Sequence, residues 1–136
     1  GLTNDGTHLI YTDGGDKLHY IDPATKRIVR SVPVTENGRP LPKLNELEWV
    51  DGMIWANVWY SDRIVIVDPR SGKVTASIDL SGLLRPEEQG SRHHVLNGIA
   101  RDPATGAIWV TGKRWPWMFN IEPVPVSPPP AEEVSR

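Results

Sequence analysis

The feature that most constrains this chain is a repeat of short strands with a period of 46 residues. Ile21-Asp22-Pro23 and Val67-Asp68-Pro69 lie one period apart, and each separates two runs rich in β-branched residues. In both places the Asp side chain can cap the turn, while Pro fixes φ at the next position. A period of this length with four strands per unit is typical of a β-propeller blade. No segment shows a sustained helical period, which excludes solenoids of helical repeats.

Three segments of the chain can be superimposed as blade-like units, which predicts an all-β fold with about three blades. Each unit is expected to contain three strands joined by turns, and the first two units add a fourth strand. The units cover residues 1–32, 45–78 and 97–121. A hairpin signal joins the first strand to the second in every unit; the signals are Asn4-Asp5-Gly6, Asp51-Gly52 and Ala104-Thr105-Gly106.

Two insertions and a proline-rich tail interrupt or follow the repeat. The insertions span residues 35–43 and 81–94, and Pro86-Glu87-Glu88 in the second suits a single helical turn. Long loops on a rigid scaffold often carry function. We therefore predict a partial propeller over residues 1–122 and an extended or disordered tail over residues 123–136.

Composition excludes several classes of function. The formal net charge is −2, so the chain has no basic footprint for nucleic acid. No apolar run approaches the ~18 residues that a membrane span requires. The absence of cysteine excludes thiol catalysis, disulfides and Cys-based zinc sites.

The number of blades and the start of the chain point to an incomplete ring. Closed propellers have roughly 4–8 blades, more than the three units found here. The chain starts at Gly1-Leu2-Thr3 without a methionine, and this start is expected to lie inside a strand. We therefore expect a truncated or processed chain that forms part of a ring. The open edges of such a partial ring would be an association hazard.

Polar side chains interrupt two otherwise apolar predicted strands. Asn45, Glu46 and Glu48 lie in the run Leu44–Trp49, and Asn57 lies in the run Trp55–Trp59. The same two runs contain three of the six tryptophans. A few hydrogen-bonding groups among aromatic walls are typical of a ligand pocket.

At these runs the chain resembles the plant and bacterial type of glutaminyl-peptide cyclotransferase. Four motifs carry the resemblance in family order, namely Leu44–Trp49, Trp55–Trp59, Val95–Ala100 and Val110–Pro116. The resemblance runs from Gly1 to about Ile121. It implies a five-bladed propeller that converts the N-terminal glutamine of a peptide or protein to pyroglutamate and releases ammonia. It implies no required cofactor and no zinc, although some members hold a calcium ion in the channel, mainly on backbone oxygens.

The same resemblance implies that part of the active site lies outside this chain. The family has about two further blades before the point where this chain starts. They carry a Phe-Gly-Glu-Gly-like segment whose glutamate is thought to shuttle the proton. The chain therefore resembles the C-terminal portion of such an enzyme, and secretion or export to the periplasm is expected.

The resemblance also assigns roles to individual residues. Asn45 is expected to contact the substrate, although an Asn can also cap an inter-blade turn. Lys113 is expected to steady the oxyanion or the missing glutamate, against the alternative of an exposed surface lysine. Trp59 is expected to wall the pocket, against packing between blades.

The remaining polar and aromatic residues are divided between site and scaffold. Glu46 is a secondary substrate-binding candidate, and Glu48, on the same face, is expected to be structural. Asn97 begins the third unit as Asn45 begins the second, so a channel-lining role and a structural amide role are both open. Trp55 and Trp109 occupy equivalent repeat positions and are expected to pack in the core. His93-His94 is interpreted as part of a polar loop, so no metal ligand is predicted.

Two alternative functions stay open from the sequence. The chain could be a non-catalytic propeller module that binds a partner or serves as a scaffold. It could also resemble lactonase-like or strictosidine-synthase-like propellers, in which Asn45, Glu46 and Asn97 would hold a metal.

Overall fold

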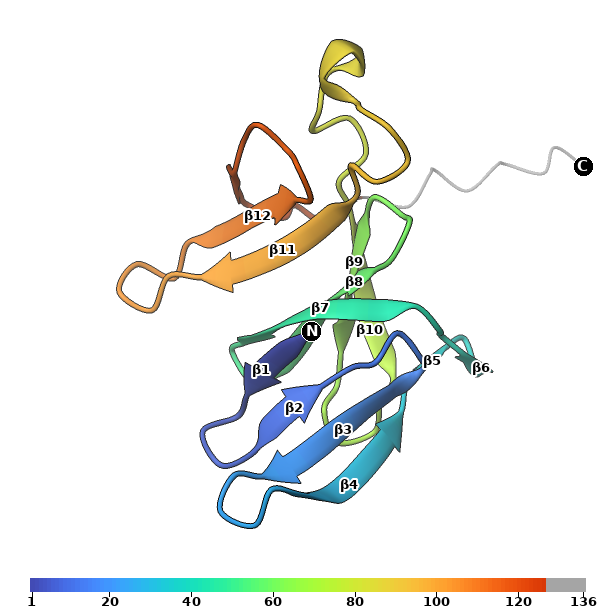
Figure 1. Ribbon diagram of the computed structural model, residues 1–136, viewed down its shortest axis with the longest axis vertical. Coiled ribbons are helices and arrows are strands. Elements are labelled where there is room, and N and C mark those ends of the chain that lie inside the picture. Colours follow the sequence, from blue (N-terminus) through green and yellow to red (C-terminus); the bar gives the residue numbers. More distant parts are fainter. Residues whose placement is uncertain (127–136) are drawn as a thin grey trace, which may run out of the picture.

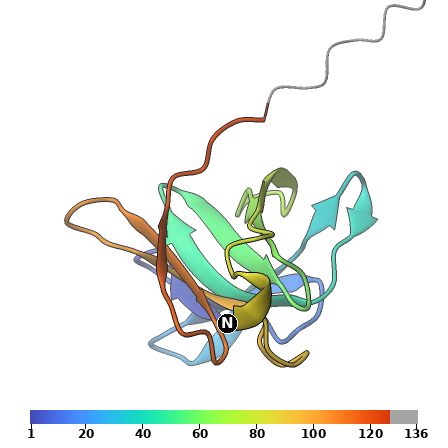
Figure 2. The ribbon, with the colours of Figure 1, turned by 90° about the horizontal axis from the view of Figure 1, so that it is seen from above.

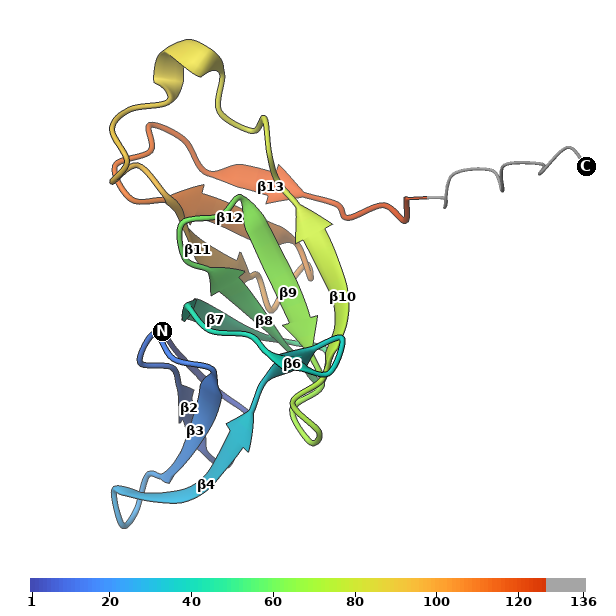
Figure 3. The same ribbon diagram turned by 90° about the vertical axis from the view of Figure 1, so that its right-hand side faces the viewer.

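Three antiparallel sheets stacked face to face form the body of the structure. The computed structural model describes residues 1–126. Figure 3 shows the three sheets arranged one above the next, in the order in which they occur in the sequence. The one helical element among the described residues is the 3₁₀ turn η1 (Pro86–Glu88), at the position predicted for a helical turn. No helix in residues 1–126 is long and apolar enough to cross a membrane.

Each sheet is an up-and-down meander whose strands follow the predicted units (Figure 1). The first sheet contains β1 (Leu2–Asn4), β2 (Leu9–Tyr11), β3 (Lys17–Asp22) and β4 (Arg27–Pro33). The second contains β7 (Leu44–Val50), β8 (Met53–Val58), β9 (Arg63–Val67) and β10 (Val74–Asp79). The third contains β11 (Leu96–Arg101), β12 (Ile108–Gly112) and β13 (Phe119–Ile121). The prediction of two four-stranded units and one three-stranded unit is therefore confirmed.

The Asp-Pro turns have the predicted chemistry. The Oδ1 atom of Asp22 accepts a hydrogen bond from the Ala24 backbone at 2.8 Å, and its Oδ2 atom accepts one from the Thr25 hydroxyl at 3.0 Å. Asp68 makes the same pair of bonds to Arg70 and Ser71. Asp102 repeats the pattern in the third sheet, where the turn joins the first strand to the second.

Two hydrophobic clusters hold the sheets together. The cluster between the first and second sheets contains Ile10, Leu18, Leu47 and Val65, all fully buried. The cluster between the second and third sheets is built around Ile64, Leu96 and Val110, with Trp55 at its border. Burying one such side chain stabilises the fold by roughly 1.5–3 kcal/mol. The second sheet is therefore covered on both faces, and β8 is buried at four consecutive positions.

The two outer faces of the stack carry exposed apolar side chains. Leu2 and Ile28 lie on the free face of the first sheet, and Trp109 lies on the free face of the third. The prediction of core packing is correct for Trp55, which is 8% exposed, and wrong for Trp109, which is 38% exposed. The positions are equivalent, but the third sheet covers Trp55, whereas no sheet formed by residues 1–126 covers Trp109.

Both insertions have defined structures. The first forms the small hairpin of β5 (Thr35–Glu36) and β6 (Arg39–Pro40), whose turn has positive φ at Asn37 and Gly38. The second, drawn in yellow in Figure 1, extends beyond the ends of the sheets. The Trp117 indole donates a hydrogen bond of 2.7 Å to Glu88 and links this insertion to the loop after β12.

The predicted tail is described only in part. Residues 123–126 have no regular secondary structure and border a groove with β10. Figure 2 shows this stretch, in red, leading away from the sheets. The rest of the predicted tail lies outside the described residues, so the domain division at residue 122 stays a prediction.

Candidate active site

Matched β-bulges shape the first strand of the second and third sheets. In β7 the register shifts between Leu44 and Leu47, and in β11 it shifts between Leu96 and Ile99. The two bulges contain Asn45 and Asn97, respectively. A bulge places an extra residue in one strand and re-aims its side chain. The repeat therefore presents an asparagine at the same point of two neighbouring sheets.

The remaining predicted site residues lie at one end of the sheets. The Trp59 backbone N–H donates to the Lys43 carbonyl at 2.8 Å, which closes the end of β8 onto the start of β7. The Lys113 N–H donates to the Val95 carbonyl at 2.9 Å, which does the same for β12 and β11. Because both bonds lie at the same end of their sheets as the two bulges, Asn45, Trp59, Asn97 and Lys113 share one edge.

Lys113 and Trp59 form a direct pair across two sheets. The Lys113 Nζ atom lies 5.5 Å from the centroid of the Trp59 ring. Such a cation–π contact contributes about 0.5–1 kcal/mol at an exposed site. Trp59 also stacks on Tyr60, with ring centroids 4.7 Å apart and planes inclined by 17°. The lysine is therefore held against an aromatic surface, and the role of Trp59 as a pocket wall stays a prediction.

Asn45 is held by its backbone and leaves its side chain available. Its carbonyl accepts a hydrogen bond of 2.5 Å from the Thr12 hydroxyl of the first sheet. Its side-chain amide makes no hydrogen bond to any group within residues 1–126, so the alternative of a turn cap does not describe it. The amide can therefore donate to, or accept from, a bound molecule.

Glu46 is half-buried beside the third sheet. It borders a cavity of about 160 Å³ that is also lined by Gly98, Thr111 and Trp109. Burial raises the pKa of Glu46, the Gly1 amino group opposes this effect, and Glu48 adds to the increase. Burial lowers the pKa of the Gly1 amino group, while the charge of Glu46 raises it and that of Lys113 lowers it. A carboxylate and an ammonium thus lie on the same side of the stack.

The comparisons with known proteins identify the family of this chain. The family model described as glutamine cyclotransferase matches residues 1–123. The chain belongs to the glutamine cyclotransferase family. The match supports the family reading over the lactonase-like one, and it covers all the site residues discussed above.

Individual members of the glutamine cyclotransferase family are similar over most of this chain. A glutaminyl-peptide cyclotransferase from Arabidopsis thaliana is 40% identical over 126 residues, which are 90% of this chain and 39% of that protein. The crystal structure of Myxococcus xanthus glutaminyl cyclase matches with a TM-score of 0.86 and 38% identity, over 90% of this chain and 53% of that one. The chain therefore spans about two fifths of the plant protein and half of the bacterial one.

More distant structures support the fold alone. The WD40 β-propeller domain of Doa1 matches with a TM-score of 0.51 at 14% identity, covering 79% of this chain and 31% of that one. Kuenenia stuttgartiensis hydrazine synthase matches with a TM-score of 0.55 at 16% identity, covering 80% and 27%. The predicted propeller architecture is thus supported.

Two polar residues of the family motifs join the sheets. The Glu48 Oε1 atom accepts a hydrogen bond of 2.8 Å from the Arg101 backbone N–H, which agrees with its predicted structural role. Asn57 is fully buried, and its Oδ1 atom accepts a hydrogen bond of 3.1 Å from the Gly98 N–H. Asn57 thereby holds the bulge that contains Asn97. The Oδ1 atom of Asn97 is itself buried and has no hydrogen-bond partner among the described residues.

Sequence reasoning missed Tyr60. No motif distinguishes this tyrosine, and its stacking on Trp59 depends on a backbone φ of +61° that only the structure reveals. The histidines lie in a polar loop as expected, where the Ser91 hydroxyl accepts a hydrogen bond from the His93 backbone N–H and pairs with the His94 ring. No group of three or more His, Cys, Asp or Glu side chains within residues 1–126 is arranged to hold a metal ion.

The raised pKa of Glu46 predicts a specific dependence of stability on pH. A carboxyl group whose pKa is raised by folding stabilises the fold fully below its unfolded value of about 4.5, and this contribution is lost as pH rises through the folded value. Glu46→Gln is therefore expected to be more stable than wild type at pH 7. The difference should vanish below about pH 4.

Urea unfolding between pH 3.5 and pH 7.5 measures this effect. Glu122→Gln, at an exposed position, controls for the loss of one negative charge. A wild-type protein that is more stable than Glu46→Gln at pH 7 would contradict the assignment.

Proposed function

We propose that this chain forms part of the active site of a glutaminyl-peptide cyclotransferase. The enzyme would convert the N-terminal glutamine of a peptide or protein to pyroglutamate and release ammonia. The observation that carries the proposal is the contact of the Lys113 ammonium with the Trp59 ring, at the same end of the sheets as the bulge that contains Asn45. The family match supports the same reaction.

The reaction needs a group that stabilises an oxyanion and groups that bind the reacting amide, and side chains at this end of the sheets can supply them. The α-amine attacks the side-chain amide carbon of the same residue, a C–N bond forms, and the carbonyl oxygen becomes an oxyanion. The bond to the amide nitrogen then breaks, and that nitrogen leaves as ammonia after it gains a proton. Attack within one residue needs little further loss of entropy once the side chain is folded back.

Each side chain has a distinct proposed role. The Lys113 ammonium would stabilise the oxyanion, because preorganised charge acts most strongly where charge develops. Asn45 would hydrogen-bond the reacting amide. Trp59 would cover the glutamine side chain and keep water from the α-amine, whose usual pKa of about 7.7–8.0 falls on desolvation.

Glu46 and Asn97 complete the proposed binding surface. The Glu46 carboxylate can accept a hydrogen bond from the substrate amine. Asn97 lies in the neighbouring bulge, at the same end of the sheets. The proton-shuttling glutamate implied by the resemblance is not among these residues, so proton transfer is assigned to the rest of the protein.

Ammonia release tests the proposal. We expect the full-length protein to release ammonia from a peptide that begins with glutamine, and not from the same peptide beginning with asparagine. We expect no release from residues 1–136 alone. Release from these residues alone would contradict the assignment of proton transfer elsewhere, and no release from the full-length protein would favour the alternative of a binding or scaffold module.

We propose that the reaction needs no zinc and that any calcium is structural. Calcium takes about 6–8 oxygen ligands. The resemblance implies that backbone oxygens supply most of the ligands, and the unpaired Oδ1 atom of Asn97 is a candidate side-chain ligand. We expect a zinc-selective chelator to leave ammonia release unchanged. Calcium should raise the melting temperature, and Asn97→Ala should reduce that increase. Export of the protein stays a prediction.

A further inference from the structure

Two adjoining cavities lie beyond the Lys113–Trp59 pair. One has a volume of about 260 Å³ and is bordered by Tyr60, Asp62 and Val95. The other has a volume of about 200 Å³ and extends toward Gln89 and Trp115. They share four lining residues, which are Asp62, Ser91, Arg92 and His94. We call the two together the loop cleft.

The loop cleft is joined to the proposed glutamine site at two points. Tyr60 borders the cleft and stacks on Trp59. Val95 also borders it and accepts the backbone hydrogen bond of Lys113. A peptide whose first residue lies at the Lys113–Trp59 pair would therefore contact Tyr60 next and then enter the cleft.

The backbone at this edge is held in an uncommon conformation. Lys43, Tyr60 and Arg114 all have φ between +60° and +67°. Tyr60 lies in the turn between β8 and β9, Arg114 in the turn between β12 and β13, and Lys43 directly before β7. Residues other than glycine seldom adopt this region, and bulky ones least of all. Such conformations cluster at ligand-binding sites, where the surrounding structure enforces them. Tyr60 stacks on Trp59 and is still 54% exposed, so much of this residue remains open to solvent.

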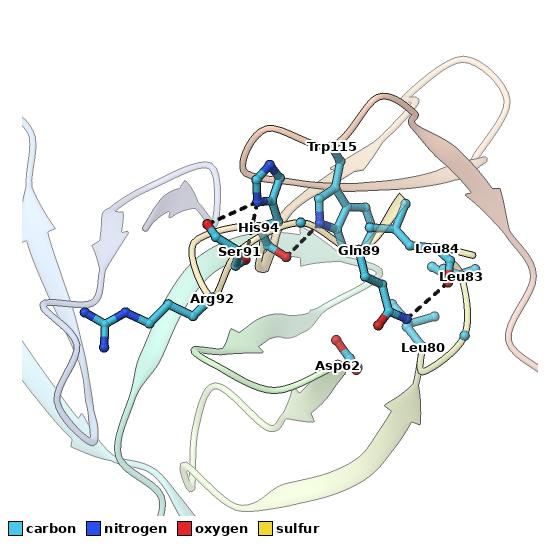
Figure 4. Close-up of a pocket in the computed structure, with 11 residues that line it drawn as sticks. Asp62, Leu80, Leu83, Leu84, Gln89, Ser91, Arg92, His94 and Trp115 are labelled. Atoms are coloured by element: carbon cyan, nitrogen blue, oxygen red, sulfur yellow. Dashed lines mark hydrogen bonds between the residues drawn. The ribbon is translucent and has the colours of Figure 1, made fainter. Parts of the chain in front are cut away.

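Two charged side chains line the cleft, those of Asp62 and Arg92. Asp62 takes part in no ion pair within residues 1–126. Figure 4 shows Asp62 below His94 and next to the end of the Gln89 side chain in this view, whereas the Arg92 side chain extends away from the other residues drawn. The wall formed by the second insertion is fixed by the Trp115 indole, which donates to the His94 carbonyl at 3.1 Å. The cleft is therefore lined by the Asp62 carboxylate and by a loop that the Trp115–His94 hydrogen bond holds in place.

We propose that the loop cleft binds the residues that follow the N-terminal glutamine of the substrate, with Tyr60 as the stacking surface and Asp62 as a selector for basic side chains. This inference rests on the proposed function and extends it to the choice of peptide. Each cavity is smaller than the roughly 300–1,000 Å³ of a small-molecule site, which suits one or two amino-acid residues. A free glutamine would leave the cleft empty.

The test compares substrates of different length in the full-length protein. Glutamine amide has no following residue, and a set of tetrapeptides carries Lys, Ala or Glu after the glutamine. We expect Tyr60→Asn to lower the ratio of kcat/KM for the Ala tetrapeptide over glutamine amide by about 3- to 10-fold. Asparagine tolerates the left-handed backbone, so this variant is expected to fold. Tyr60→Phe should keep the wild-type ratio.

Charge gives a second, independent readout. We expect wild type to prefer the Lys peptide over the Glu peptide, and Asp62→Asn to reduce that preference by about 2- to 5-fold. Asp68→Asn is the matched control. Asp62 directly precedes strand β9, and Asp68 directly follows it at the other end. Unchanged length and charge preferences in these variants, with glutamine amide still converted, would overturn the inference. Failure of every substrate with wild type would instead overturn the proposed function.

Discussion

Replacing Lys113 with methionine is expected to lower kcat for ammonia release by about 10²- to 10³-fold in the full-length protein. The physical reason is the loss of a fixed positive charge where the oxyanion develops, an effect of about 2.7–4 kcal/mol in comparable sites. The fold should lose no more than about 1 kcal/mol, because the contact between Lys113 and Trp59 is a cation–π pair at the protein surface. Steady-state kinetics together with urea unfolding separates the two effects.

Two further variants make the Lys113 result specific. Lys113→Arg keeps the charge and should recover part of kcat, limited by the different shape of the guanidinium. Lys73→Met removes the same charge beside the Asp68 turn, at the opposite end of the second sheet, and should leave kcat unchanged. Retention of more than a tenth of kcat by Lys113→Met would show that the ammonium is not the group that stabilises the oxyanion.

The largest effect on stability is expected at Asn57. Asn57→Ala removes the acceptor of the Gly98 N–H and leaves a cavity at a position with no solvent exposure. An unpaired buried N–H costs about 1–3 kcal/mol, and the cavity adds to this, so a loss of about 2–4 kcal/mol is expected. The midpoint of urea unfolding measures it, with an unchanged slope expected.

Asn120→Ala is the matched control for Asn57→Ala. Asn120 also makes a side-chain hydrogen bond to the backbone of the third sheet, but it is exposed. The expected loss is below about 1 kcal/mol. Equal losses in the two variants would mean that the bond between the second and third sheets contributes nothing special.

The blades could be predicted from the sequence because their turns are local. Asp22 and Asp68 each bond to backbone and hydroxyl groups within three residues, so the chemistry is readable from a short stretch of chain. The bulge in β7 changes the spacing of buried residues from the alternation of a regular strand. Leu44 and Leu47 are three residues apart and are buried in the same cluster, which is the spacing that an extra residue in one strand produces.

Contacts between sheets were not predictable in the same way. Asn57 and Gly98 are 41 residues apart, and nothing local pairs them. The same holds for Lys113 and Trp59, whose meeting depends on how the second and third sheets pack. Trp109 was placed wrongly because an equivalent position in the repeat guarantees the same strand geometry but not the same neighbour.

The joint between the second and third sheets has a consequence for how residues 1–136 open on heating or in denaturant. Trp59 belongs to the sheet that is covered on both faces, whereas Lys113 belongs to one that is covered on a single face. Parts of a protein with fewer buried contacts open at lower free energy than the whole. Detachment of the third sheet would carry the ammonium away from the indole while the second sheet stays folded. Amide hydrogen exchange on residues 1–136 would then record the third sheet opening before the second.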